Sequence, residues 1–135
     1  MPVHRVVRLD HVQLAMPAGQ EAVAEAFYCD LLGMEVLEKP AVLAARGGRW
    51  FGADAGRVQV HLGVEADFRP AKKAHPALGI DALDGLVAVL EDAGVGVRWD
   101  EENPGVRRCY VEDPFGNRIE LIDAAPDAAE AAGSP

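Results

Sequence analysis

The chain has 135 residues and a mass of 14.4 kDa, enough for one compact domain with its own core and too little for two. Apolar residues make up 50%, charged residues 26%, and the mean hydropathy is zero, which excludes a disordered or fibrous chain. No apolar run approaches the roughly 20 residues of a membrane-spanning helix, and the N-terminus lacks the continuous apolar stretch of a signal peptide. We therefore expect a cytoplasmic protein without a membrane partner.

The charge and the cysteines narrow the classes of partner. Thirteen basic and 22 acidic residues give a formal net charge of −9. A negatively charged surface repels phosphate backbones and anionic lipid, so we expect no nucleic-acid partner. The net charge still allows an anionic substrate in a locally positive pocket. Cys29 and Cys109 have no CxxC spacing and no companions for a disulfide framework, and we interpret both as ordinary thiols.

The first half of the chain is predicted to form one strand, one helix and three further strands. Apolar and polar residues interleave over 6–14, and this strand pattern stops at Met16-Pro17-Ala18-Gly19. Apolar residues then recur every three or four positions over 21–32, and Gly33 follows as a C-terminal cap, which predicts an amphipathic helix. The three further strands are predicted at 34–37, 49–53 and 57–63, the last two joined by an Asp54-Ala55-Gly56 hairpin turn.

The second half repeats this order after a linker at 65–73. We predict a strand at 75–80, a helix at 83–93 capped by Gly94, and strands at 95–99, 107–112 and 117–122. Asp113-Pro114-Phe115-Gly116 is a strong turn signal between the last two strands. Residues 124–135 are rich in alanine and proline without a pattern, and we expect a frayed tail there.

The duplication predicts the fold class. Both halves read β-α-β-β-β, and neither half alone could bury both its helix and its sheet. We expect a single α+β domain over 1–135, in which two paired βαβββ modules, about 6–64 and 74–123, form a cup-shaped half-barrel with the helices outside.

Four polar residues occupy corresponding places in the two modules. His11 and His75 fall in the first predicted strand of each half, and His61 and Glu120 fall in the last. If the modules pair about a pseudo-twofold axis, three neutral imidazoles and one carboxylate converge inside the cup, a set suited to Zn, Fe, Mn, Co or Ni as the divalent ion. The alternative interpretation is that each histidine is simply a hydrogen-bonded strand residue.

Four motifs stand out along residues 6 to 123. They are Leu9-Asp10-His11-Val12, Ala26-Phe27-Tyr28 with Leu32-Gly33-Met34, His75-Pro76-Ala77-Leu78, and the most specific, Val111-Glu112-Asp113-Pro114-Phe115-Gly116-Asn117-Arg118-Ile119-Glu120-Leu121. With these motifs the chain resembles the vicinal-oxygen-chelate superfamily, which includes glyoxalase I, extradiol dioxygenases, methylmalonyl-CoA epimerase, and fosfomycin-resistance and bleomycin-resistance proteins. The chain is similar to single-chain, two-module members.

The resemblance implies a metal-dependent enzyme that chelates a small oxygen-rich substrate on one divalent metal. It carries the metal ligands over as His11, His61, His75 and Glu120, with Glu120 and His61 as the catalytic candidates. Glyoxalase I enzymes commonly have a carboxylate where this chain has His61, whereas extradiol dioxygenases and fosfomycin-resistance enzymes use two histidines and one glutamate. Isomerase or lyase chemistry is slightly favoured, followed by dioxygenase and antibiotic-modifying transferase chemistry; the alternative is a metal-free drug-binding protein.

Further residues are candidates for substrate binding. Arg49 and Trp50 fall on one predicted strand, Arg108 and Tyr110 on another, and Arg118 is two residues before Glu120 and on the same face. The competing interpretations are core packing for Trp50 and solvent-exposed strand ends for the arginines. The resemblance also implies a homodimer, since members of the superfamily often dimerise.

Overall fold

The computed structural model describes residues 3–124, so the predicted tail falls, apart from Ala124, outside the described residues. The chain divides into two compact units, Met1–Arg69 and Pro70–Pro135, which we call unit 1 and unit 2 and describe separately. None of the helices in the described part of the chain is long and apolar enough to cross a membrane.

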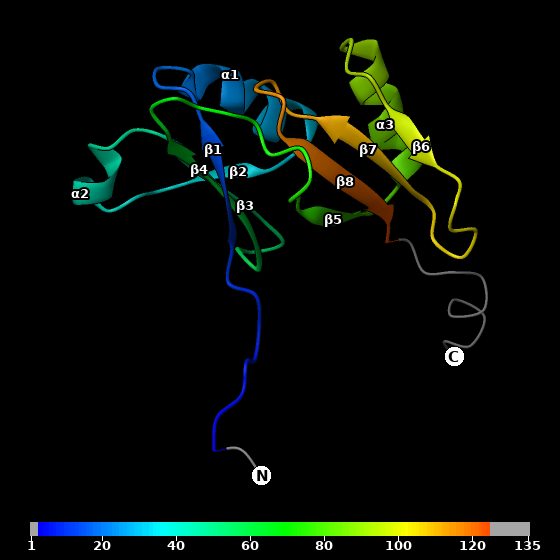
Figure 1. Ribbon diagram of the computed structural model, residues 1–135, viewed down its shortest axis with the longest axis horizontal. Helices are drawn as coiled ribbons and strands as arrows, with labels where there is room; N and C mark the ends of the chain where they lie inside the picture. The colour runs from blue at the N-terminus through cyan, green and yellow to red at the C-terminus, as the bar shows by residue number, and fades with distance from the viewer. Residues whose placement is uncertain (1–2, 125–135) are drawn as a thin grey trace. The chain divides into compact units, whose positions relative to one another are not determined.

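Unit 1 contains a four-stranded sheet in the order β1-β4-β3-β2 (Figure 1). β1 and β4 pair in parallel, and the other neighbours pair antiparallel. Helix α1 follows β1 and continues directly into a π-helical segment, η1, in which the adjacent Phe27 and Tyr28 are both buried. The bounds are β1 Val12–Met16, α1 Glu21–Glu25, η1 Ala26–Leu31, β2 Glu35–Leu37, α2 Ala41–Ala44, β3 Arg49–Ala53 and β4 Val58–Val64.

Unit 2 repeats the arrangement, with sheet order β5-β8-β7-β6. β5 and β8 are parallel, the other pairs are antiparallel, and helix α3 packs against β8. The two units therefore share one topology, which confirms the α+β class and the βαβββ repeat. The bounds are β5 Ala77–Ile80, α3 Leu83–Asp92, β6 Arg98–Asp100, β7 Arg108–Glu112 and β8 Arg118–Asp123.

The main differences from the predicted elements lie at strand starts. β1 begins at Val12 rather than at residue 6, because the preceding segment has no strand partner and leaves Val6 94% and Leu9 75% exposed. β5 begins at Ala77, after Pro76. The short helix α2 between β2 and β3 was not predicted, because four residues are too few to show a helical period.

Alternation along each strand separates a core face from a polar face. In unit 1, Tyr28 of η1 stacks on Phe51 of β3 at 5.0 Å between ring centroids, and both are fully buried. In unit 2, Ile119 and Leu121 of β8 are fully buried, while Glu120 between them belongs to the opposite face. The polar face of each sheet is therefore the side that is available for a site.

The Asp113–Gly116 turn contains a buried hydrogen-bond network. Asp113 is 4% exposed, and its Oδ1 accepts hydrogen bonds from the backbone N–H groups of Phe115 and Asn117 at 2.9 Å each. The Asn117 Nδ2 donates to Asp113 Oδ2 at 2.9 Å, and the Asn117 Oδ1 accepts from the Ala71 N–H at 3.0 Å. The turn thereby fixes both the start of β8 and the segment that leads to β5.

The two thiols differ in accessibility, and this gives a first prediction. Cys109 is fully buried in β7 and Cys29 is half-buried; burial raises the pKa of both. We expect an aromatic disulfide reagent at pH 8 to modify Cys29 slowly and Cys109 only upon unfolding, because the thiolate is the reactive form. The absorbance of the released thiolate, measured with and without urea, checks this: one thiol per chain without urea and two with it. The Cys29→Ser variant reports the modification rate of Cys109 alone. A Cys109 rate without urea equal to that of Cys29 would contradict the prediction.

Candidate functional site

Strand register places the four predicted ligands at equivalent positions of the two units. In unit 1, His61 of β4 lies opposite Gln13 of β1, and His11 is two residues before Gln13. In unit 2, Glu120 of β8 lies opposite Ala77 of β5, and His75 is two residues before Ala77. Each unit therefore brings together one pair, His11 with His61 and His75 with Glu120.

In unit 2, His75 and Glu120 bring two hydrogen-bond acceptor atoms close together. The Nε2 of His75 is 2.8 Å from Glu120 Oε1, and Glu120 is 6% exposed. The Nδ1 of His75 is 2.8 Å from the backbone carbonyl oxygen of Lys73, which can only accept, so Nδ1 carries a proton. In a neutral imidazole Nε2 is then also an acceptor, and a proton or another cation must lie between it and the carboxylate.

His11 is oriented in a similar way in unit 1. Its Nδ1 lies 2.9 Å from Asp10 Oδ1, and this hydrogen bond is the main cause that lowers the pKa of the Asp10 carboxyl. A carboxylate on one ring nitrogen commonly fixes the tautomer of a metal-binding histidine and leaves the other nitrogen as the donor. The imidazole and carboxylate groups of the two pairs are ligand types that suit a first-row divalent ion.

The His61 ring makes more contacts than the rings of His11 and His75, and contacts of a different kind. Its ring is stacked against His11 at 4.1 Å and against Trp50 at 4.3 Å, and its Nε2 lies 2.9 Å from Gln59 Oε1. Burial, followed by the charge of His11, lowers the pKa of His61. The neutral ring therefore has its Nε2–H donating to Gln59, and metal binding through Nε2 would require that hydrogen bond to break.

The lowered pKa of His61 predicts a dependence of stability on pH. Between the folded pKa and the ordinary value of about 6.5, the unfolded chain binds more protons than the folded chain, so stability falls as the pH falls through this range. We expect the free energy of unfolding of metal-free protein to fall less between pH 7.5 and 5.5 in His61→Gln than in wild type, and unchanged behaviour in His4→Gln, which changes an exposed histidine. Urea unfolding at several pH values measures this dependence. If the free energy of unfolding changed with pH equally in wild type and His61→Gln, a lowered pKa of His61 would be contradicted.

The predicted substrate residues of β3 lie on opposite faces of the sheet. Trp50 is on the face of His61, which lies opposite it in the sheet register. Arg49 instead donates to Glu25 of α1 at 2.7 Å and to the Gly48 carbonyl at 2.9 Å. Neighbouring strand residues point to opposite faces, so Arg49 lies on the side of α1 and not on the face that Trp50 shares with His61.

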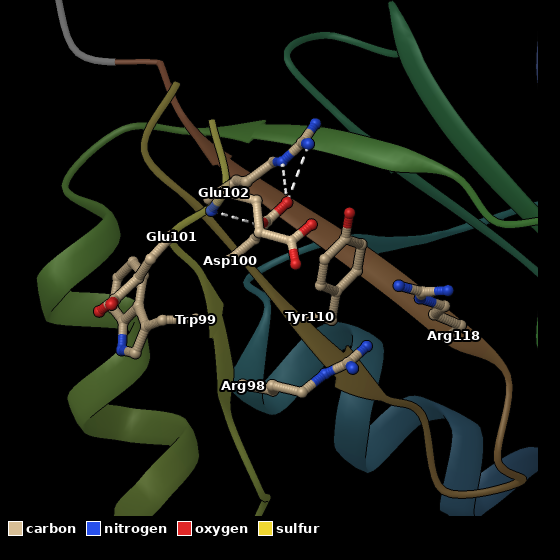
Figure 2. A pocket seen from close by; sticks show the side chains of 8 residues that line it. Arg98, Trp99, Asp100, Glu101, Glu102, Tyr110 and Arg118 are labelled. Carbon is tan, nitrogen blue, oxygen red and sulfur yellow. Dashed lines mark hydrogen bonds and ion pairs between the residues drawn. The ribbon is translucent and has the colours of Figure 1, made fainter. Parts of the chain in front are cut away.

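A cavity of about 380 Å³ lies on the polar face of unit 2 (Figure 2). Three residues predicted to bind substrate, Arg108, Tyr110 and Arg118, line it, together with β6 and the residues after it. Arg108 bonds Asp100 through Nε and Nη2 at 2.9 Å each and approaches Glu120 Oε2 with Nη1 at 3.3 Å. The cavity therefore adjoins the His75–Glu120 pair, whose His75 ring also meets Tyr110 edge-to-face at 5.7 Å.

The sequence interpretation missed the other five residues that line this cavity, Arg98, Trp99, Asp100, Glu101 and Glu102. Arg98 and Asp100 are in β6, and the register places Arg98 opposite Tyr110 and Asp100 opposite Arg108. The alternation of Arg98, Trp99 and Asp100 could have shown that the two charged residues share a face. The register that brings them to Tyr110 and Arg108 cannot be read from the sequence, because no short turn connects β6 to β7.

Neither unit, in its described part, gathers three or more His, Cys, Asp or Glu side chains into a group that could hold a metal ion. Each contributes two of the four predicted ligands. A site formed from one pair alone would leave the remaining metal positions to water or substrate.

The comparison with protein families identifies the chain. Residues 8–121 match the model of the Glyoxalase/Bleomycin resistance protein/Dioxygenase superfamily. The chain belongs to this superfamily. Its members include enzymes such as dioxygenases and typically use a divalent metal ion.

Solved structures similar to this glyoxalase-superfamily protein come from several bacteria. A protein described as a glyoxalase family member from Bacillus anthracis is 45% identical, with a TM-score of 0.84 over 89% of this chain and 97% of that one. The fosfomycin resistance protein FosX from Listeria monocytogenes is 17% identical, with a TM-score of 0.68 over 88% and 94%. An antibiotic binding protein from Streptomyces sp. CB03234 is 24% identical, with a TM-score of 0.65 over 87% and 98%. The last two show the fold alone, and no curated protein matches the chain.

Proposed function

We propose that this protein is a metal-dependent enzyme of the vicinal-oxygen-chelate type, in which one divalent transition metal binds a small oxygen-rich substrate through two neighbouring oxygen atoms. Isomerase or lyase chemistry is our first candidate, ahead of dioxygenase and antibiotic-modifying transferase chemistry. The observation that carries the proposal is the His75–Glu120 pair, two acceptor atoms that face each other at 2.8 Å.

The chemistry of this pair suits a cation. A buried carboxylate and an imidazole nitrogen at hydrogen-bond distance share a proton, and a divalent ion that binds both atoms replaces that proton. Lys73 and Arg108 hold the two partners in orientation through contacts with His75 Nδ1 and Glu120 Oε2. We propose the residues predicted from the sequence, His11, His61, His75 and Glu120, as the metal ligands.

The residues around the pair would bind and orient the substrate. When bound, the metal would supply a positive charge that stabilises negative charge on the substrate oxygens. Arg108, Tyr110 and Arg118 line the adjoining cavity and would position the substrate. We propose Glu120 as the group that moves a proton and His61 as a second acid–base group.

Titration of metal-free protein with Co²⁺ tests the proposal, because cobalt bound to nitrogen and oxygen ligands has visible absorption bands. We expect about one ion per chain, a proton released to the buffer on binding, and weaker binding in His75→Ala but not in the control His4→Ala. Absence of saturable binding to wild-type protein by Co²⁺, Zn²⁺, Fe²⁺, Mn²⁺ and Ni²⁺ would overturn it.

A metal-free small-molecule or drug-binding protein is the second candidate. It is favoured by one observation, that each described unit holds two ligand-type residues of the predicted set rather than three. In that case the stacked Trp50 and His61 rings of unit 1, or the cavity of unit 2, would bind the molecule directly. Small-molecule binding that is unaffected by a chelator, in a protein that takes up no metal, would support this candidate.

We further propose that the protein is a homodimer. The segment before β1 presents Val3, Val6, Val7 and Leu9 to solvent, all at least 71% exposed. Exposed apolar side chains that gather in one segment are candidates for a protein–protein interface. We expect light scattering to give a dimer for wild type and a monomer for Val6→Lys/Leu9→Lys; a monomeric wild type would contradict this.

A further inference from the structure

The cavity of unit 2 contains two guanidinium groups without an acidic partner. The central carbon atoms of the Arg118 and Arg98 guanidinium groups lie 4.0 Å and 5.3 Å from the centre of the same Tyr110 ring. Within residues 3–124, neither group forms an ion pair, and the Nε of Arg118 is buried without a hydrogen-bond partner. Buried polar groups in proteins are nearly always hydrogen-bonded, so the Arg118 guanidinium, whose Nη1 donates to the Lys72 carbonyl oxygen at 3.4 Å, keeps donor capacity that residues 3–124 do not use.

The third arginine of the cavity is neutralised. Arg108 is paired with Asp100 and Glu120. The backbone N–H of Glu102 and, to a smaller degree, Arg108 lower the pKa of Asp100, so Asp100 stays anionic and holds Arg108. Arg98 and Arg118 are therefore the two cationic side chains of the cavity that form no ion pair within residues 3–124.

Comparison of the two units shows that the strand positions of Arg98 and Arg118 carry no charge in unit 1, where the cation near the equivalent Trp50 ring is Lys39, at 5.9 Å. Tyr110 lies opposite Glu120 as Trp50 lies opposite His61, and Arg98 lies opposite Tyr110 as Leu37 lies opposite Trp50. Arg118 and Gln59 each precede the predicted ligand of their strand by two residues. Where unit 1 has an apolar and a neutral side chain, unit 2 has two cations on the same face of an otherwise equivalent sheet.

We propose that the cavity of unit 2 binds the anionic group of a small molecule, a carboxylate, phosphonate or phosphate, between Arg98 and Arg118 beside the Tyr110 ring. Guanidinium groups present parallel N–H donors that match the oxygens of these anions. A volume of about 380 Å³ suits a small metabolite. Arg98, Tyr110 and Glu120 lie opposite one another on three neighbouring strands, so the anion would be beside a predicted metal ligand. Assigning this molecule as the substrate therefore rests on the proposed function.

The acidic residues of the cavity restrict where the anion binds. Glu101 and Glu102 follow β6 and line the cavity, whereas Arg98 and Arg118 border the Tyr110 ring (Figure 2). Like charges repel, so the anionic group is confined to the part of the cavity formed by the two arginines. The remainder of the ligand extends toward Glu120 or toward Glu101 and Glu102.

Nitrogen-15 NMR of the arginine Nε–H groups tests this directly in metal-free protein, with inorganic phosphate and phosphonoacetate as probes and sodium chloride adjusted to constant ionic strength. We expect a saturable shift of the Arg118 signal, which Arg118→Gln identifies by its loss. Arg98→Gln and Arg118→Gln should each raise the Kd by about tenfold or more, since each removes a charge-assisted hydrogen-bond pair. Arg57→Gln, which changes an exposed arginine paired with Asp54 in unit 1, should leave the Kd unchanged.

The possible results separate this inference from the proposed function. No saturable shift of the Arg118 signal, or a Kd unchanged in Arg98→Gln, overturns the anion site, whatever the protein does with metals. If Arg118→Gln does not fold, as judged by circular dichroism, the exposed Arg98 decides the result through Arg98→Gln. Anion binding in a protein that takes up no metal supports the site and contradicts the metal-dependent function alone.

Discussion

Replacement of Glu120 by glutamine is expected to lower the affinity for a divalent metal by about 100-fold or more, because it removes the only carboxylate of the proposed ligand set. Glutamine keeps the shape of the side chain and can still form a hydrogen bond with His75 Nε2, so the buried pair is retained without its charge. Arg108 keeps its partner Asp100 in the variant. The loss is therefore expected in metal binding rather than in folding.

Competition of the protein with a coloured chelator for Zn²⁺ measures this affinity. Glu112→Gln is the matched control, because Glu112 is an exposed carboxylate of the neighbouring strand β7 that pairs with Lys72 at 3.2 Å. We expect the control to bind as wild type does. Equal affinity in Glu120→Gln and wild type would remove Glu120 from the ligand set.

Asp113→Ala is expected to destabilise the protein by about 3 kcal/mol. The substitution leaves the N–H groups of Phe115 and Asn117 and the Asn117 Nδ2 without the acceptor they have in the native turn. Each buried donor left unpaired costs about 1–3 kcal/mol, offset in part where water enters. A loss of this size is a large fraction of the stability of a small domain.

Urea unfolding followed by circular dichroism measures the effect, with Asp92→Ala as the control. Asp92 is an exposed aspartate at the end of α3, and its removal should change stability by less than about 0.5 kcal/mol. The turn also bonds Ala71 through Asn117, four residues before His75. A change below about 1 kcal/mol for Asp113→Ala would show that the network is not what holds this turn.

Most of the fold could be predicted from the sequence, because periodicity and turn residues act locally. The strand at 49–53 was predicted with the bounds that β3 has, and Gly33 and Gly94 end their helices in the left-handed region, at φ of +78° and +83°. The strand predicted from residue 6 was wrong in its first half. The pattern of Val6 and Leu9 is that of a strand, but a strand also needs a neighbour to pair with, which the pattern does not show.

The candidate site was less predictable, because it depends on register and on ionic partners. Period two places Arg118 on the face of Glu120, as expected, and both occur on that face in β8. Arg49 and Arg108 looked equivalent in the sequence, yet one pairs with Glu25 on the helix side and the other with Asp100 and Glu120 in the cavity. The side of the sheet on which a strand arginine lies follows from strand alternation, but which side the helix covers depends on packing between elements, which the strand's own sequence does not show.

Elemental analysis by mass spectrometry of anaerobically purified wild-type protein, beside folded His75→Ala and Glu120→Ala variants, tests the central claim most directly. The account predicts close to one transition-metal ion per chain in the wild type and loss of that ion in both variants. The identity of the ion would then direct the choice of substrates to screen. Wild-type protein that contains no such metal and takes up none when it is added, or variants that retain the full content, would contradict the claim.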